Sequence, residues 1–412
     1  MSQLILESHF PKSLSALWAS NLYCGHPEHH FALAEHFRSN IYYLQHFSAA
    51  YLYPWILDCV SNNKTKFPYL SENIKSTQQI LIGYLKNKKE DVKLQEQLIT
   101  DALTIETSNS SGNIKPLFVG NTDLEILPHD GVPFIRDTYF KTLENISGFL
   151  ADKRSPLISA KGSSQVKIIR NQVRLANGTF WVGSNYTLIG LSEFIQSNGL
   201  SAPDKTAIEE TEKGFKETFR NHNNFPLLWV GPDKPVRYRG HDYYYPLTGH
   251  LDDFMCPLYS YRNKEVYLYA ELNSKFYCGS REAESDVIVN LQRPLLESTA
   301  EQISKQLMAK GKTLELIHVP VLWDDAALYP FVNCITQNAG NELIVHLPQF
   351  RIEGNERFNT TSIHCENEIL NRLKNTRDFK VRVQFLQEFN FTENIRANKG
   401  GIHCMINPYP AQ

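Results

Sequence analysis

The chain has 412 residues, with 42 basic and 44 acidic side chains and a net charge of -2 at pH 7. Its hydrophobic content of 42% and charged content of 21% are those of an ordinary globular protein, and the length allows a large core and two domains. The balanced charge, without a long basic run, argues against a nucleic-acid partner. No apolar segment is long enough to cross a bilayer, so we predict no membrane partner either.

The first eight residues contain no basic region followed by an apolar stretch, so they do not indicate a secretory signal. We therefore predict a cytoplasmic protein, with export by a route that needs no signal peptide left open. Seven cysteines, an odd number without a Cys-x-x-Cys pair, favour a reduced compartment in which most of them are buried. They are Cys24, Cys59, Cys256, Cys278, Cys334, Cys365 and Cys404.

Residues 10 to about 106 are predicted to be helical, because apolar side chains recur there at helical spacing. Examples are Ile80, Leu81, Tyr84 and Leu85. A polar segment at 107–113 is the best linker in the chain. The sequence thus predicts a helical N-terminal domain over 1–107, able to recruit a protein partner, and a second domain over 112–412.

The segment 24–36 is rich in histidine and also holds Cys24, so it invites a zinc interpretation. Its spacing matches no standard zinc pattern, and Pro27 interrupts the helix that would align the ligands. We favour a polar helix start with surface histidines, and we predict no metal site.

Beyond the linker, short apolar runs alternate with helical patterns, which indicates a mixed α/β domain. The runs predict strands at 116–119, 179–182, 227–230, 266–270, 314–319, 343–347 and 381–386. The helical patterns lie at about 191–198, 205–221, 295–310 and 366–376. The order helix, strand, loop, strand occurs twice, which is a weak sign of an internal repeat.

Three motifs contain side chains that could take part in catalysis or ligand binding. Phe134-Ile135-Arg136-Asp137 offers a carboxylate, Gly249-His250-Leu251-Asp252-Asp253-Phe254 offers a His-x-Asp pair, and Gly400-Gly401-Ile402-His403-Cys404 offers a thiol. If the second motif is a strand, His250 and Asp252 point to the same face while Leu251 packs behind them. The simpler alternative is a strand end with a solvated histidine and aspartate.

Cys404 is the candidate nucleophile, because the preceding glycines let the backbone approach a ligand closely. A buried, inert thiol is the alternative, and we favour it for Cys59, Cys256, Cys278, Cys334 and Cys365. Asp137 and Asp252 could bind a planar guanidinium, whose paired N–H groups match a carboxylate. Alone, Asp137 would be interpreted as half of a surface pair with Arg136.

In this order, the three motifs resemble the guanidino-group-modifying (pentein) superfamily over roughly residues 112–412. The segment 249–254 is similar to the Gly-His-Val-Asp-Glu-Phe form of protein-arginine deiminases, as is His403-Cys404-x-x-Asn407 to their end. The segment 400–404 is equally close to the ending of agmatine deiminases. The resemblance implies an α/β fold of five ββαβ units in a pseudo-symmetric propeller, preceded here by the helical N-terminal domain.

The resemblance also implies a mechanism that needs no metal or organic cofactor. Asp137 and Asp252 hold the guanidinium, Cys404 attacks its central carbon, and His250 serves as general acid and then general base. Many relatives carry an acid in the second unit where this chain has Ala176 or a close neighbour. Asn177 is the substrate-binding candidate there.

The first choice of substrate is peptidyl-arginine, and agmatine or free arginine is the alternative. An amidinotransferase would use the same residues, and the sequence does not distinguish it from a hydrolase. A binding module that keeps the fold without turnover is the alternative of another class, and the missing acid favours it. The sequence does not indicate an oligomeric state.

Overall fold

The computed structural model describes a little over half of the chain. The described residues are 14–19, 32–33, 35–37, 40–45, 79–83, 115–119, 180–182, 186–192, 195, 202–204, 206, 209–210, 213, 227–339, 342–376, 378–387, 391–397, 401–405 and 407–410. The chain divides into a first unit, residues 1–7, 14–171 and 405–412, and a second unit, residues 8–13 and 172–404. No helix among the described residues is long and apolar enough to span a membrane.

Three sheets of the second unit share one plan: two antiparallel strands, a helical crossover, and a third strand parallel to the second. The first contains β5 (Phe180–Val182), β6 (Thr187–Gly190) and β7 (Leu227–Val230). The second contains β10 (Met255–Tyr261), β11 (Lys264–Glu271) and β12 (Thr313–Trp323), to which β13 (Leu328–Pro330) is added. The third contains β14 (Ile335–Asn338), β15 (Glu342–Pro348) and β16 (Lys380–Leu386). The plan is therefore ββαβ, repeated along the chain.

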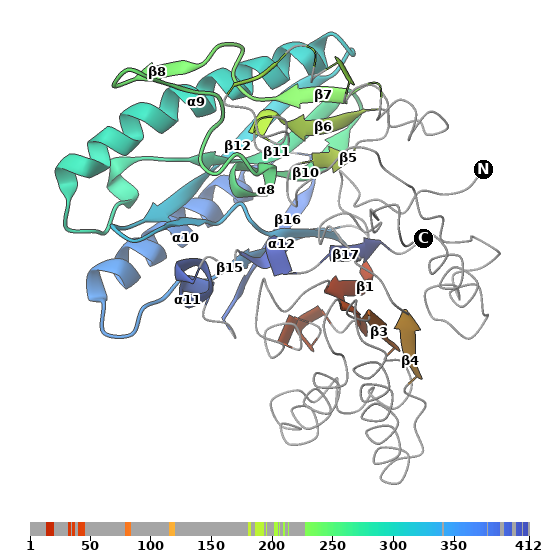
Figure 1. Ribbon diagram of the computed structural model, residues 1–412. Helices are drawn as coiled ribbons and strands as arrows, with labels where there is room; N and C mark the ends of the chain where they lie inside the picture. Colours follow the sequence, from red (N-terminus) through yellow and green to blue (C-terminus); the bar gives the residue numbers. More distant parts are fainter. Residues whose placement is uncertain are drawn as a thin grey trace, which may run out of the picture. The chain divides into compact units, whose positions relative to one another are not determined.

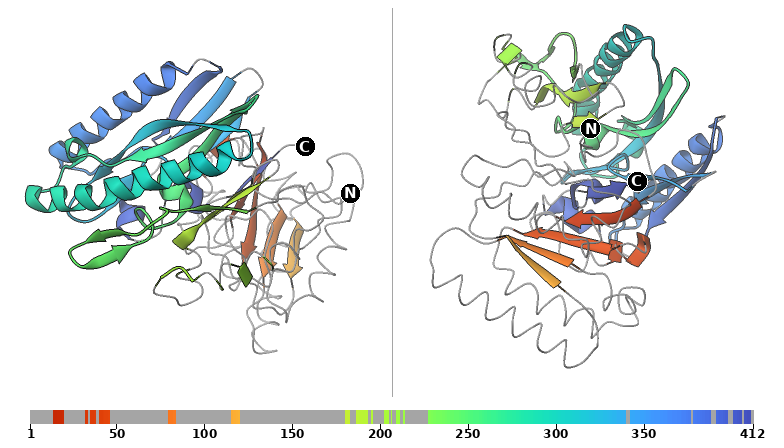
Figure 2. Two further views of the ribbon diagram at one scale, coloured as in Figure 1. Left: turned by 90° about the horizontal axis from the view of Figure 1, so that it is seen from above. Right: turned by 90° about the vertical axis from the view of Figure 1, so that its right-hand side faces the viewer.

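Two long helices make the crossovers of the second and third sheets, and both pack against β12 (Figure 1). They are α9 (Glu282–Met308) and α10 (Glu356–Lys374). In α10 the buried residues recur every three or four positions, which gives the helix one face toward the core. Figure 2 shows that both helices run alongside the strands. Parallel strands need such crossovers, since a tight turn cannot join them.

The central strands are mostly apolar because they are covered on both faces. In β11 six consecutive residues from Glu265 to Ala270 are buried. A short hairpin, β8 (Val236–Tyr238) with β9 (His241–Tyr243), and the single-turn helices η3 (Ser274–Phe276) and α11 (Phe391–Arg396) complete the second unit beside the site helices described below.

The first unit contains a five-stranded sheet in the order β17-β1-β2-β3-β4. Its strands are β1 (Leu14–Ala19), β2 (Asn40–Gln45), β3 (Gln79–Gly83), β4 (Lys115–Val119) and β17 (Asn407–Pro410). β17 is antiparallel to β1, and β1 is parallel to β2 with helical residues at 32–33 and 35–37 between them. This part repeats the ββαβ plan with strands from opposite ends of the chain.

The seven strands expected beyond the linker are all confirmed, at β4, β5, β7, β11, β12, β15 and β16. The helical prediction for residues 10–106 is wrong at β1, β2 and β3. Ile80-Leu81-Ile82 is a short apolar run, and periodicity alone cannot distinguish such a run in a buried parallel strand from a helix.

The linker at 107–113 lies outside the described residues, so the predicted domain limits stay a prediction, as does the five-bladed propeller. The described strands form a mixed α/β structure of several small sheets, and none of these sheets closes on itself.

Candidate functional site

The His-x-Asp motif lies in a single helical turn, not in a strand as predicted. His250 is the N-cap of α8 (Leu251–Phe254), which leads directly into β10. Gly249 precedes it with φ +85°, a conformation that favours glycine, and a Cβ there would lie 2.4 Å from the Cβ of Ser192. The Ser192 hydroxyl donates to the Gly249 carbonyl at 2.6 Å, which fixes this entry to the turn.

The turn gathers one imidazole and two carboxylates. A ligand atom from each of His250, Asp252 and Asp253 lies within 4.8 Å of the others. Asp252 is buried, as is Leu251 behind it, while His250 is half-buried. The Thr248 hydroxyl donates a short hydrogen bond to Asp253 Oδ2. Sequence neighbours thus form a compact group that is suited to a cation.

The C-terminal motif reaches the same place from 151 residues away. His403 lies in α12 (Ile402–Met405), is 2% exposed, and has its Nδ1 3.1 Å from Asp252 Oδ2. An ionised carboxylate can only accept, so Nδ1 donates in this contact. Cys404 follows in the same turn, and its side chain lies outside the described residues. The contact thus joins α12, the turn that bears Cys404, to α8, the turn that His250 caps.

Asn333 connects the same two turns from a third one. It is fully buried between β13 and β14, and its Nδ2 donates to Asp252 Oδ2 at 3.2 Å and to Asp253 Oδ1 at 3.4 Å. Its Oδ1 accepts the backbone N–H of His403 at 2.8 Å. A Cβ on Gly401 would lie 2.5 Å from that oxygen, so glycine is what lets the chain approach.

An aromatic ring closes one side of the group. Trp181, on β5, packs its ring against that of His403 with the centroids 4.8 Å apart. Trp181 is 3% exposed, and its indole N–H has no hydrogen-bond partner in the described part of the chain. The ring makes the surroundings of His403 apolar, which strengthens the electrostatic interactions of the group.

Two neighbouring carboxylates cannot both ionise without cost. Burial and then the charge of Asp252 raise the pKa of Asp253 from its ordinary value of 3.8 to about 6. The positive charge of His250 and the hydrogen bonds from Thr248 and Asn333 act in the opposite direction. A bound cation would relieve the repulsion, so the group has an electrostatic reason to take one.

The side chains of this group are suited to two kinds of cation. One imidazole and two carboxylates could hold a divalent metal, and the two carboxylates could equally accept the N–H groups of a planar guanidinium. Among the described residues no other group of histidine, cysteine and acidic side chains is close enough to hold a metal ion.

The sequence predictions for this site divide into three kinds. His250 and Asp252 are close together, while Asp137 and Asn177 lie outside the described residues, as does the segment 24–30. The buried state expected for four other cysteines is confirmed, whereas Cys59 is not described. The four are Cys256, Cys278, Cys334 and Cys365.

Four residues of the site received no role from the sequence: Trp181, Asp253, Asn333 and His403. A signal for Asn333 was present in the repeat. α8, the turn at 331–334 and α12 each precede an outer strand of a ββαβ unit, namely β10, β14 and β17. Aligning the units would have selected all three turns.

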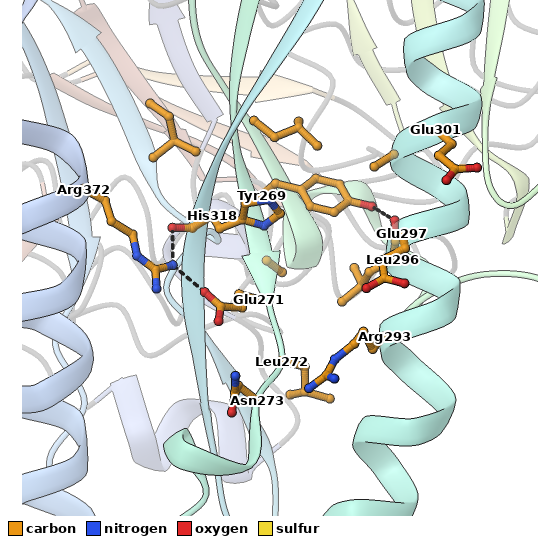
Figure 3. Close-up of a pocket in the computed structure, with 14 residues that line it drawn as sticks. Tyr269, Glu271, Leu272, Asn273, Arg293, Leu296, Glu297, Glu301, His318 and Arg372 are labelled. Atoms are coloured by element: carbon orange, nitrogen blue, oxygen red, sulfur yellow. Dashed lines mark hydrogen bonds and ion pairs between the residues drawn. The ribbon is translucent and has the colours of Figure 1, made fainter. Parts of the chain in front are cut away.

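A cavity of about 970 Å³ lies elsewhere in the second unit, over β11 and β12 and between α9 and α10 (Figure 3). Its floor includes Tyr269, whose hydroxyl donates to the Leu296 carbonyl at 2.7 Å. Arg372 of α10 forms an ion pair with Glu271 and donates to the His318 carbonyl at 2.9 Å. Arg293, Glu297 and Glu301 approach from α9 (Figure 3).

Comparison with known proteins gives distant structural likeness only. No family model matches the chain, and no curated protein matches its sequence. Its structure is similar to that of the putative arginine deiminase from Porphyromonas gingivalis, with 12% identity and a TM-score of 0.42 over 99% of this chain and 98% of that one. At this level of similarity the function has to be argued from the site residues.

Proposed function

We propose that this protein is a cysteine-dependent hydrolase of guanidino groups, which converts peptidyl-arginine to peptidyl-citrulline with release of ammonia. The observation that carries the proposal is the contact between two motifs 151 residues apart: His403 Nδ1 lies 3.1 Å from Asp252 Oδ2. His403 precedes Cys404, and Asp252 belongs to the His250 turn. The proposed nucleophile and the proposed acid thus belong to turns that are in direct contact.

The proposed reaction has two steps. The thiolate of Cys404 forms a bond to the guanidinium carbon, and His250 gives a proton to the departing nitrogen, which leaves as ammonia. His250 then takes a proton from water, whose oxygen bonds to the same carbon while the carbon–sulfur bond breaks. The protonated ureido group that leaves the sulfur then loses its proton, which the released ammonia takes up in solution, so that the products are a neutral ureido group and ammonium, and the thiolate is regenerated.

Two carboxylates in a poorly solvated site explain why a guanidinium would bind. Asp252 and Asp253 repel each other, and a planar cation with paired N–H donors offsets that repulsion. Asp137 and Asn177 are proposed as further contacts to the substrate. The cation would also favour the thiolate form of Cys404, because opposite charges lower a thiol pKa.

The test is turnover on an arginine-containing peptide, free arginine and agmatine, with ureido product and ammonia measured together. We expect the peptide to react fastest and Cys404→Ser to lower turnover by about 10⁴-fold or more, as loss of a nucleophile does. Cys278→Ala is the matched control, because Cys278 is buried and its thiol donates to the Trp323 carbonyl.

Each other outcome selects an alternative. Turnover that survives Cys404→Ser removes this thiol from the mechanism. A guanidino product that forms only with an added primary amine identifies an amidinotransferase. If none of the three guanidines reacts, the binding module is the better interpretation.

A metal ion is the second occupant that the geometry favours, since the ligand atoms of His250, Asp252 and Asp253 are within 4.8 Å of one another. Dialysis against EDTA distinguishes a site for a metal ion from a site for a guanidinium substrate. Under the proposal, turnover stays unchanged after chelation. Loss of turnover that a divalent cation restores would assign the site to a metal instead.

A further inference from the structure

Asn333 is the point where the three turns of the site meet. Its buried amide uses the nitrogen for Asp252 and Asp253 and the oxygen for the backbone of His403. The partners lie 81, 80 and 70 residues away in the chain. One side chain thus holds two carboxylates and the turn that bears Cys404.

Only an amide of this length meets both demands. A carboxylate is an acceptor and cannot donate to two other carboxylates, and an aliphatic side chain can do neither. The approach of Gly401, where a Cβ would lie 2.5 Å from the Asn333 oxygen, leaves no room for a longer side chain. The donor faces the acids and the acceptor faces the nucleophile turn, so reversing the amide would break the arrangement.

We propose that Asn333 is a positioning residue, which sets the Cys404 turn against the His250–Asp252 turn and stabilises both acids in their charged form. The inference rests on the proposed function for its catalytic meaning, and it concerns a residue outside all three sequence motifs. Asn333 acts through Asp252, Asp253 and His403 and need not touch the substrate.

Asn333→Asp is the decisive variant, because it keeps the shape and the acceptor but places a third carboxyl group beside two others. At about pH 8 the new group is ionised, and we expect turnover to fall about 100-fold or more. At about pH 5.5 the new carboxyl can bind a proton and donate to Asp252, so its turnover relative to the unchanged protein should recover about 10-fold.

Asn359→Asp is the matched control. Asn359 also uses both ends of its amide, with Oδ1 accepting from Ile352 N at 2.9 Å and Nδ2 donating to Ile352 O at 2.8 Å. Asn359 lies on α10, and both of these hydrogen bonds are to Ile352, which is not a residue of the site. Its turnover relative to the unchanged protein should be flat across pH. If Asn333→Asp is equally flat, Asn333 has a structural role only and the inference is wrong.

A second readout does not need turnover. The rate at which iodoacetamide alkylates Cys404, followed by peptide mass spectrometry, reports the thiolate directly. Added negative charge disfavours the thiolate, so Asn333→Asp should move the pH midpoint of alkylation upward by about one unit, and Asn359→Asp should not.

These readouts separate the two proposals. An alkylation shift in a protein that hydrolyses no guanidine would retain the positioning role and remove the hydrolase. Turnover on a guanidine, with no alkylation shift and no pH-dependent recovery in Asn333→Asp, would retain the hydrolase and remove the positioning role. If circular dichroism finds Asn333→Asp unfolded, Asn333→Ser replaces it: alkylation of Cys404 should slow about 5-fold or more against Asn359→Ser, and equal rates would overturn the inference.

Discussion

Two polar regions of the second unit differ in how their charged groups are held. In the site, Asp252, Asn333 and His403 are at most 2% exposed, and each contacts a turn other than its own. In the cavity between α9 and α10, Glu297 and Glu301 project from one exposed face of a helix (Figure 3). The cavity thus holds the more solvated charges.

The difference matters because chemistry depends on environment more than on volume. A buried polar group costs free energy unless it is hydrogen-bonded, so a buried network persists only where its geometry is fully specified. Exposed charges on a helix surface need no such support and contribute little. We therefore expect substitutions in the site to change activity strongly and substitutions in the cavity to leave it unchanged.

The largest effect should come from Asp252→Asn. The variant keeps the shape of the side chain but removes the charge that accepts from His403 and Asn333 and that would face the guanidinium. We expect turnover to fall by about 10³-fold, the scale of losing one fixed electrostatic contact to a reacting group.

The control for this comparison is Asp286→Asn, which alters an exposed carboxylate that accepts from Ser274 at 3.1 Å. Its turnover should stay within about two-fold, as surface substitutions usually do. A loss of less than about ten-fold in Asp252→Asn would mean that this carboxylate neither holds the substrate nor positions the nucleophile turn.

Asp253→Asn should change stability in a way that depends on pH. The pKa of Asp253 is raised to about 6, so between its ordinary value of 3.8 and 6 the unfolded chain ionises while the folded protein keeps the proton. Stability therefore falls as pH rises through this window, and the penalty remains above it. Asparagine cannot ionise, so the variant should melt about 2–4 °C higher near pH 8 and gain nothing near pH 4.

Asp325→Asn is the matched case of opposite sign. Hydrogen bonds from Tyr277 and from Ser280 hold the pKa of Asp325 well below its ordinary value. Its charged form stabilises the fold above the unfolded pKa, and that stability is lost as pH falls. Thermal unfolding near pH 8 and near pH 4 is the measurement. Near pH 8 it should find Asp253→Asn stabilised and Asp325→Asn destabilised. Two variants that shift in the same direction would contradict the environment assigned to Asp253.

How far the sequence predicts this molecule depends on whether a signal is local. Strands such as β11 and β15 were predictable, because a covered strand must be apolar along its length. The same pattern misled at β3, since a short apolar run fits a helix as well. At His250 the strand prediction failed because Gly249, with φ +85°, turns the chain into α8 instead.

The site shows the same limit more sharply. The proximity of His250 and Asp252 was predictable because they lie within one motif, whereas the role of Cys404, selected for the two glycines before it, stays a prediction. Asn333 was missed, since a lone asparagine between β13 and β14 looks like any turn residue until the repeated units are aligned. Its role exists only through partners 70 or more residues away, which the fold brings together.

The smallest effect should come from the cavity. Glu297→Gln with Glu301→Gln removes two exposed charges from α9, and no hydrogen bond or ion pair of either side chain is present among the described residues. We expect turnover and melting temperature to stay within about two-fold and 1 °C of the unchanged protein.

Arg372→Ala probes the other wall of the cavity, where the ion pair with Glu271 is half-buried. This variant should cost about 1 kcal/mol in unfolding free energy without changing turnover. A ten-fold loss of turnover in either variant would move the chemistry to the cavity, because charges this solvated affect a reaction strongly only where substrate displaces the water around them.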